Sequence, residues 1–78
     1  MMLYLELPAI FDDGIHILKI NPLSVIAYLE NSDKQTAIYI PGGTMFIIRM
    51  SILEYEQALS QFFKEVNKLN GSKLHLNR

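Results

Sequence analysis

The sequence predicts a small α+β domain: an antiparallel sheet of four to five short strands, forming a meander or partial barrel, with one C-terminal helix packed on a face. Three observations predict this class. Apolar residues recur at every second position in several short stretches of the first fifty residues, which is the period of a β-strand. Turn-forming residues separate these stretches. After residue 50 the apolar period changes to three and four, which is typical of an amphipathic helix.

The N-terminal stretches predict a β-hairpin. Residues 2–7 alternate as one strand, which we expect to end at Pro8 because proline has no N–H for a ladder. Asp12-Asp13-Gly14 predicts a turn, since aspartate bonds its own backbone and glycine supplies a positive φ. Residues 15–20 are the second predicted strand, and Asn21-Pro22 interrupts the pattern after it.

Three more strands are predicted over residues 25–30, 36–40 and 44–50. A polar loop separates the first two, and Pro41-Gly42-Gly43 predicts a tight turn before the last. Short strands joined by short turns indicate an antiparallel arrangement.

A helix is predicted over residues 51–69. Ser51 and Glu54 have the spacing of a capping box, in which each side chain bonds the backbone N–H of the other residue. Asn70-Gly71 is a suitable C-terminal stop. The apolar stripe consists of Ile52, Tyr55, Leu59, Phe62, Phe63, Val66 and Leu69.

Length and composition indicate one domain over residues 1–70, followed by a basic C-terminal tail over residues 71–78. The chain has 78 residues, of which 50% are hydrophobic, and it has no cysteine. A chain this short, without disulfides or thiolate metal sites, is marginal in stability on its own. We therefore expect it to complete its core against another chain, and a homo-oligomer is the simplest form. No basic leader or apolar stretch of membrane-spanning length is present, so a cytoplasmic location is expected.

The predicted strands are apolar on both faces, whereas one helix can cover only one. The uncovered face, or the unpaired edges of the sheet, would then bind a protein. The candidate interface residues are Tyr28, Tyr39 and Ile47.

The sequence predicts no catalytic site, cofactor or metal ion. Asp12 and Asp13 precede a glycine and are read as a turn rather than an acid/base pair. The two histidines, His16 and His75, have no further ligands at metal-binding spacing. No serine lies in a nucleophile-elbow motif, and Gly42-Gly43-Thr44 lacks the lysine of a phosphate loop.

A second hypothesis is nucleic-acid binding by the basic C-terminal segment. The whole chain has 7 basic and 8 acidic residues, but the last fifteen carry a local excess of positive charge that could contact phosphates. The candidate residues are Lys64, Lys68, Lys73, His75 and Arg78.

Residues 20–59 resemble the FlbD-like family of small motility-associated proteins. The shared pattern is a break at Asn21-Pro22, a strand ending at Glu30, a glycine-containing hairpin and a capped C-terminal helix. The same stretch is also similar to the first part of a LytTR DNA-binding domain. Gln61-Phe62-Phe63-Lys64 resembles the start of that family's DNA-contacting segment, but the helical stripe continues through residue 69, which favours the FlbD-like family.

These observations together predict a small non-enzymatic regulatory or accessory module that acts by protein–protein interaction. The alternatives are a LytTR-like nucleic-acid-binding protein and a phage or mobile-element inhibitor of a host protein.

Overall fold

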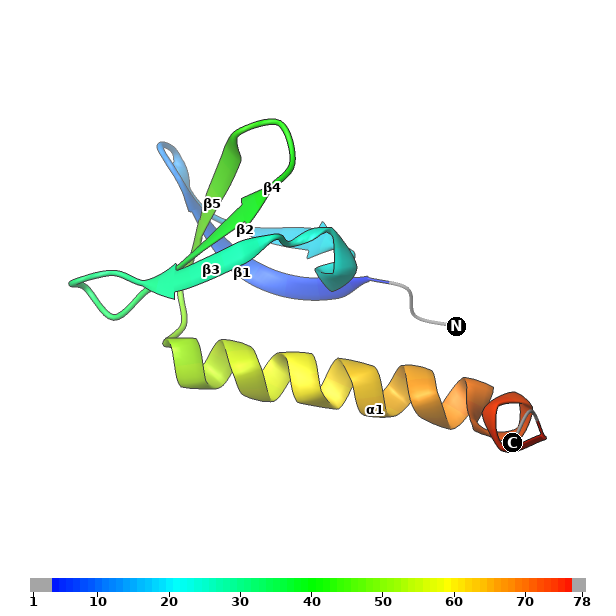
Figure 1. Cartoon of the computed structure of the whole chain (residues 1–78). Helices are drawn as coiled ribbons and strands as arrows, with labels where there is room; N and C mark the ends of the chain where they lie inside the picture. Colours follow the sequence, from blue (N-terminus) through cyan, green and yellow to red (C-terminus); the bar gives the residue numbers. More distant parts are fainter. Residues whose placement is uncertain (1–3, 77–78) are drawn as a thin grey trace.

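The computed structural model describes the backbone of residues 4–76 and the side chains of residues 4–68. Within these residues, one sheet of five antiparallel strands is accompanied by one long helix, which confirms the predicted α+β class (Figure 1). The elements in chain order are β1 (Leu5–Phe11), β2 (Gly14–Ile20), the 3-10 helix η1 (Pro22–Ser24), β3 (Ala27–Glu30), β4 (Thr36–Ile40), β5 (Thr44–Ile48) and α1 (Ile52–Leu76).

The strand order is β2-β1-β5-β4-β3. It is a meander in which the first and last strands also pair, and it is open between β2 and β3. This opening coincides with the Asn21-Pro22 break, where Asn21 accepts a hydrogen bond from the Leu23 N–H at 2.9 Å and begins η1. The chain therefore leaves the sheet at the point where a closed barrel would need β2 to pair with β3.

The first strand is longer than predicted. The expectation that Pro8 ends it is wrong: β1 runs to Phe11 and pairs Pro8 with Ile17 of β2. Pro8 is tolerated because its backbone points away from Ile17 of β2 and faces β5 only beyond the end of that strand at Ile48, where its carbonyl accepts from the Arg49 N–H at 2.7 Å. The third strand begins at Ala27 rather than at residue 25, because Val25 caps η1 and its N–H donates to the Pro22 carbonyl.

The two predicted hairpin turns are confirmed. Gly14 closes the β1–β2 hairpin with a φ of 131°, and Gly42 and Gly43 form the β4–β5 turn with φ of 95° and 84°. These positive φ values explain why glycine occupies the three positions. Both turns lie at the end of the sheet away from α1 (Figure 1).

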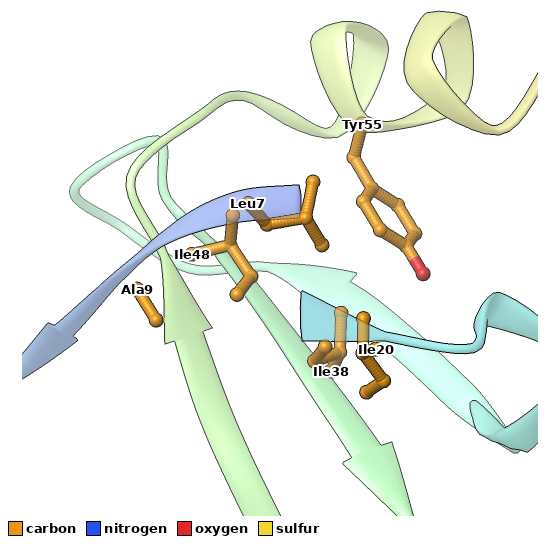
Figure 2. Packing of buried hydrophobic residues seen from close by; sticks show 6 residues of the cluster. All are labelled: Leu7, Ala9, Ile20, Ile38, Ile48 and Tyr55. Atoms are coloured by element: carbon orange, nitrogen blue, oxygen red, sulfur yellow. The ribbon is translucent and has the colours of Figure 1, made fainter. Parts of the chain in front are cut away.

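The core lies between the sheet and the first turns of α1. Figure 2 shows aliphatic side chains from four strands converging with the Tyr55 ring of the helix. The cluster consists of Leu7, Ala9, Ile20, Ile38, Ile48 and Tyr55. Thr36 is also fully buried, and its hydroxyl donates to the Met50 carbonyl at 2.9 Å. This bond ties β4 to the segment that leads into the helix.

The predicted capping box begins α1. The Ser51 N–H donates to Glu54 Oε1 at 2.9 Å, and the Glu54 N–H donates to Ser51 Oγ at 3.2 Å. The Ile52 N–H donates to Glu30 Oε2 at 3.2 Å, which attaches the helix N-terminus to strand β3. Three hydrogen bonds therefore satisfy backbone donors that a helix start leaves free.

The end of the helix corrects the prediction. α1 continues through Asn70 and Gly71 to Leu76, so the predicted stop of the helix at Asn70-Gly71 is wrong. A glycine inside a helix is unfavourable by only about 1 kcal/mol, and no proline follows to stop the helix. α1 consequently projects past the sheet (Figure 1). Among the described residues, no helix has the length and apolar character to cross a membrane.

Candidate functional site

The strand register assigns every side chain of the sheet to one of two faces. Residues directly opposite each other in an antiparallel pair point to the same side. We call the side that packs on α1 the helix face and the other side the open face. The helix face contains the buried core, for example Leu7, Ile38 and Ile48. α1 leaves the open face uncovered.

An apolar row crosses the open face over all five strands. Successive cross-strand pairs join Ile15 to Ile10, Ile10 to Ile47, Ile47 to Ala37, and Ala37 to Leu29. The row therefore runs from edge strand β2 to edge strand β3 without a polar residue. A sheet face that meets only water normally carries polar side chains at these positions.

Two more pairs of the open face extend this row on either side. Pro8 lies opposite Ile17, and Tyr39 lies opposite Met45. Four large aliphatic side chains of the face are strongly exposed, in contrast to the core residues. They are Ile15 at 46%, Ile17 at 63%, Leu29 at 50% and Met45 at 48%. Because they lie on one face, they form a patch rather than isolated surface residues, and such a patch is typical of a binding surface.

Charged residues lie at both ends of strand β2. Lys19, near its C-terminal end, is 4.0 Å from Glu6 of β1. At the other end the turn carries Asp12 and Asp13, and Asp13 Oδ1 is 2.8 Å from Nε2 of His16. The edge strand thus has an acidic end and a basic end, with apolar residues between them.

Two of the three predicted interface residues lie on the open face. Tyr39 and Ile47 are there, both half-buried by their neighbours in the sheet. Tyr28 is placed differently, which corrects the expectation that it shares this face. It lies opposite the core residue Ile38, so its side chain points to the helix face.

Tyr28 has a role in attaching the helix. Its ring is 4.9 Å from the ring of Tyr55 in an edge-to-face arrangement, and its hydroxyl donates to Glu56 Oε2 at 3.0 Å. The hydrogen bond to the Glu56 carboxylate raises the pKa of the Tyr28 phenol. Together with the bond from Ile52 to Glu30, these interactions hold α1 against the β3 edge.

Sequence reasoning missed the most exposed members of the patch. Ile15 and Ile17 share the parity of Lys19 on β2, and this parity was a signal that they face outward. Leu29 and Met45 offered no such signal, because the polar residues of their strands, Glu30 and Thr44, have the parity of the helix face.

The basic candidates are only partly within the described side chains. Lys64 and Lys68 are exposed and lie one turn apart on α1. Lys73 and His75 belong to the backbone of α1, but their side chains lie outside the described residues, as does the whole of Arg78.

Among the side chains that the structure describes, no group of three or more His, Cys, Asp or Glu residues could hold a metal ion. Comparison with known proteins found no matching family model, curated protein or solved structure. The open face and its edge strands are therefore considered on their own geometry.

Proposed function

We propose that this chain is a small non-enzymatic regulatory or accessory module that binds a protein through the open face of its sheet. The observation that carries the proposal is the apolar row across all five strands, flanked by Ile17 and Met45. The faces differ in kind: the helix face contains the buried core beside α1, whereas the open face exposes large aliphatic side chains to water.

Several polar side chains have structural partners, which supports a non-enzymatic role. Thr36 ties a strand to the helix start, Ser51 caps α1, and Asn31 accepts from the Asp33 and Gln35 N–H groups in a loop.

The magnitude of the hydrophobic effect indicates how strong such binding can be. Full burial of a large aliphatic side chain stabilises by about 1.5–3 kcal/mol, so covering the four half-exposed ones contributes roughly 4 kcal/mol. Association itself costs about 4–15 kcal/mol. The exposed aliphatic groups therefore need further contributions, from the half-buried Tyr39 and Ile47 or from backbone hydrogen bonds at a sheet edge.

The resemblance to FlbD-like proteins adds the expectation of an accessory role in motility. The elements on which it rests occur in the expected order: the break at Asn21, the strand ending at Glu30, the glycine hairpin and the capped helix. This order supports the proposed role without identifying the protein that is bound.

The test compares two substitutions of equal chemistry at different places. Met45→Glu puts a carboxylate in the open face, and Leu53→Glu puts one on α1, where Leu53 is 62% exposed. Immobilised wild type and both variants are used to capture proteins of the native host, with quantification by mass spectrometry. A protein retained by wild type and Leu53→Glu but lost with Met45→Glu is expected. Equal retention by all three would contradict the proposal.

A further inference from the structure

Edge strand β2 presents unpaired backbone groups, and the position of Pro8 shows which they are. Hydrogen-bonded and non-hydrogen-bonded pairs alternate along an antiparallel ladder. Pro8 has no N–H, and its carbonyl accepts from Arg49 on the β5 side, so the Pro8–Ile17 pair is a non-hydrogen-bonded one. The N–H and C=O of Ile17 therefore point away from β1. By alternation, so do those of Ile15 and Lys19.

The two edges of the sheet differ in how well they are protected. β3 has four residues, and Tyr28 and Glu30 on it are bound to the start of α1. β2 has seven residues, no proline, and the exposed side chains of Ile15 and Ile17 beside its outward backbone groups. Long edges with exposed apolar side chains present a template for pairing with another strand. Within the described part of the chain, β2 is the edge with these properties.

We propose that β2 pairs with β2 of a second copy of this chain, antiparallel and about a two-fold axis at Ile17. Two five-stranded sheets then join into one continuous sheet, and their open faces lie side by side. This inference rests on the proposed function, because it names a second copy as the partner at the edge of the same surface.

The register follows from the outward backbone groups. Only residues 15, 17 and 19 offer them, so these residues must face one another. With the two-fold axis at Ile17, Ile17 lies opposite Ile17 of the second copy, and Ile15 of each copy lies opposite Lys19 of the other. These three pairs give about six backbone hydrogen bonds. An axis at Lys19 would place two like charges opposite each other, which is destabilising.

Charge complementarity favours a second copy as the occupant. In the antiparallel arrangement, the acidic turn with Asp12 and Asp13 of one copy approaches the end of β2 that carries Lys19 of the other. The two-fold axis repeats this approach at the opposite end. One strand that is acidic at its start, apolar in its centre and basic at its end is complementary to itself only when antiparallel.

The test uses the full chain and measures its mass by sedimentation equilibrium over a range of concentrations. We expect wild type to reach twice the 9.0 kDa chain mass. Ile17→Glu places two carboxylates opposite each other at the axis and should weaken the dimer by about tenfold or more. Ile15→Glu is the matched control: it faces Lys19 of the second copy, so the dimer should persist or tighten.

A charge exchange tests the register independently. Ile17→Glu and Ile17→Lys should each be largely monomeric, whereas an equimolar mixture should recover the dimer mass because opposite charges then meet at the axis. Circular dichroism verifies that the variants are folded, which is expected because the side chain of Ile17 is 63% exposed and lies outside the core.

Three results would overturn the inference: a wild type that stays monomeric at all concentrations, equal effects of the two glutamate substitutions, or a mixture that does not recover the dimer. The proposed function fails separately. Met45→Glu lies on an inner strand and should leave the dimer mass unchanged while it lowers capture of the host protein. Loss of capture by Met45→Glu without any dimer would refute the edge pairing and leave the proposed function standing.

Discussion

Substitution of Thr36 by valine should destabilise the protein, although the residue pattern alone suggests the opposite. Valine has the higher β-propensity, and Thr36 is a fully buried strand residue. In the structure, however, the hydroxyl donates to the Met50 carbonyl at 2.9 Å. Leaving a buried acceptor unpaired costs about 1–3 kcal/mol, and the added methyl group offsets up to about 1 kcal/mol. The expected net loss is about 1 kcal/mol in the free energy of unfolding.

Urea unfolding followed by circular dichroism, at one fixed protein concentration, measures this loss. For a domain of this size the free energy falls by roughly 1 kcal/mol per molar urea, so the midpoint should decrease by about 1 M. Thr44→Val is the matched control, since Thr44 is exposed on the same face of the neighbouring strand and should shift the free energy by less than about 0.5 kcal/mol. A Thr36→Val midpoint equal to or above that of wild type would refute the reasoning.

Three other predictions concern the helix. Ser51→Ala should lower the free energy of unfolding by about 1 kcal/mol. Adding Glu54→Ala should cause little further loss, because the two side chains act as one cap. Urea unfolding of the double-mutant cycle tests this. Burial raises the pKa of Tyr55 to about 12, whereas the phenol of the unfolded chain ionises near pH 10. The free energy of unfolding is therefore at its full value below pH 10 and should fall by up to about 2 kcal/mol as the pH rises to 12, because only the unfolded chain ionises in this range. Thermal unfolding across this range should show a shallower decline for Tyr55→Phe, and an identical decline would contradict the assignment. Gly71→Ala should raise helicity and stability by up to about 1 kcal/mol, since Gly71 is inside α1; a decrease would indicate a helix end with positive φ at this position.

The elements whose signals are local were predictable from the sequence. The Asp12-Asp13-Gly14 and Pro41-Gly42-Gly43 turns and the Ser51 capping box depend on residues within four positions of one another, and the structure confirms all of them. The strand over residues 36–40 matches β4 because it lies between two such signals.

Local signals were misleading where a neighbouring strand or an extended helix compensated for an unfavourable residue. Pro8 does not end β1, because it faces β5 only beyond the end of that strand at Ile48, and its carbonyl still accepts from the Arg49 N–H. Gly71 does not end α1, because a glycine inside a helix costs only about 1 kcal/mol relative to alanine. In both cases the penalty of the residue is small enough for its surroundings to override it.

The candidate site was only partly accessible from the sequence. The count of apolar strand positions against a single helix predicted that one face of the sheet is apolar and uncovered, and Tyr39 and Ile47 lie on that face. The placement of Tyr28 and the exposure of Ile15 and Ile17 were not predicted.

The sequence by itself determined the hairpin turns and the start of the helix, because those depend on hydrogen bonds between residues close together in the chain. The apolar periods determined which segments are strands and which is the helix. Only the tertiary structure decided that β1 pairs with β5. That pairing in turn decides which residues form the open face and which backbone groups of β2 point outward. The physical reason is that alternation within a strand defines two sets of side chains without saying which faces the core. The cross-strand register makes that choice, and it is set by residues distant in sequence.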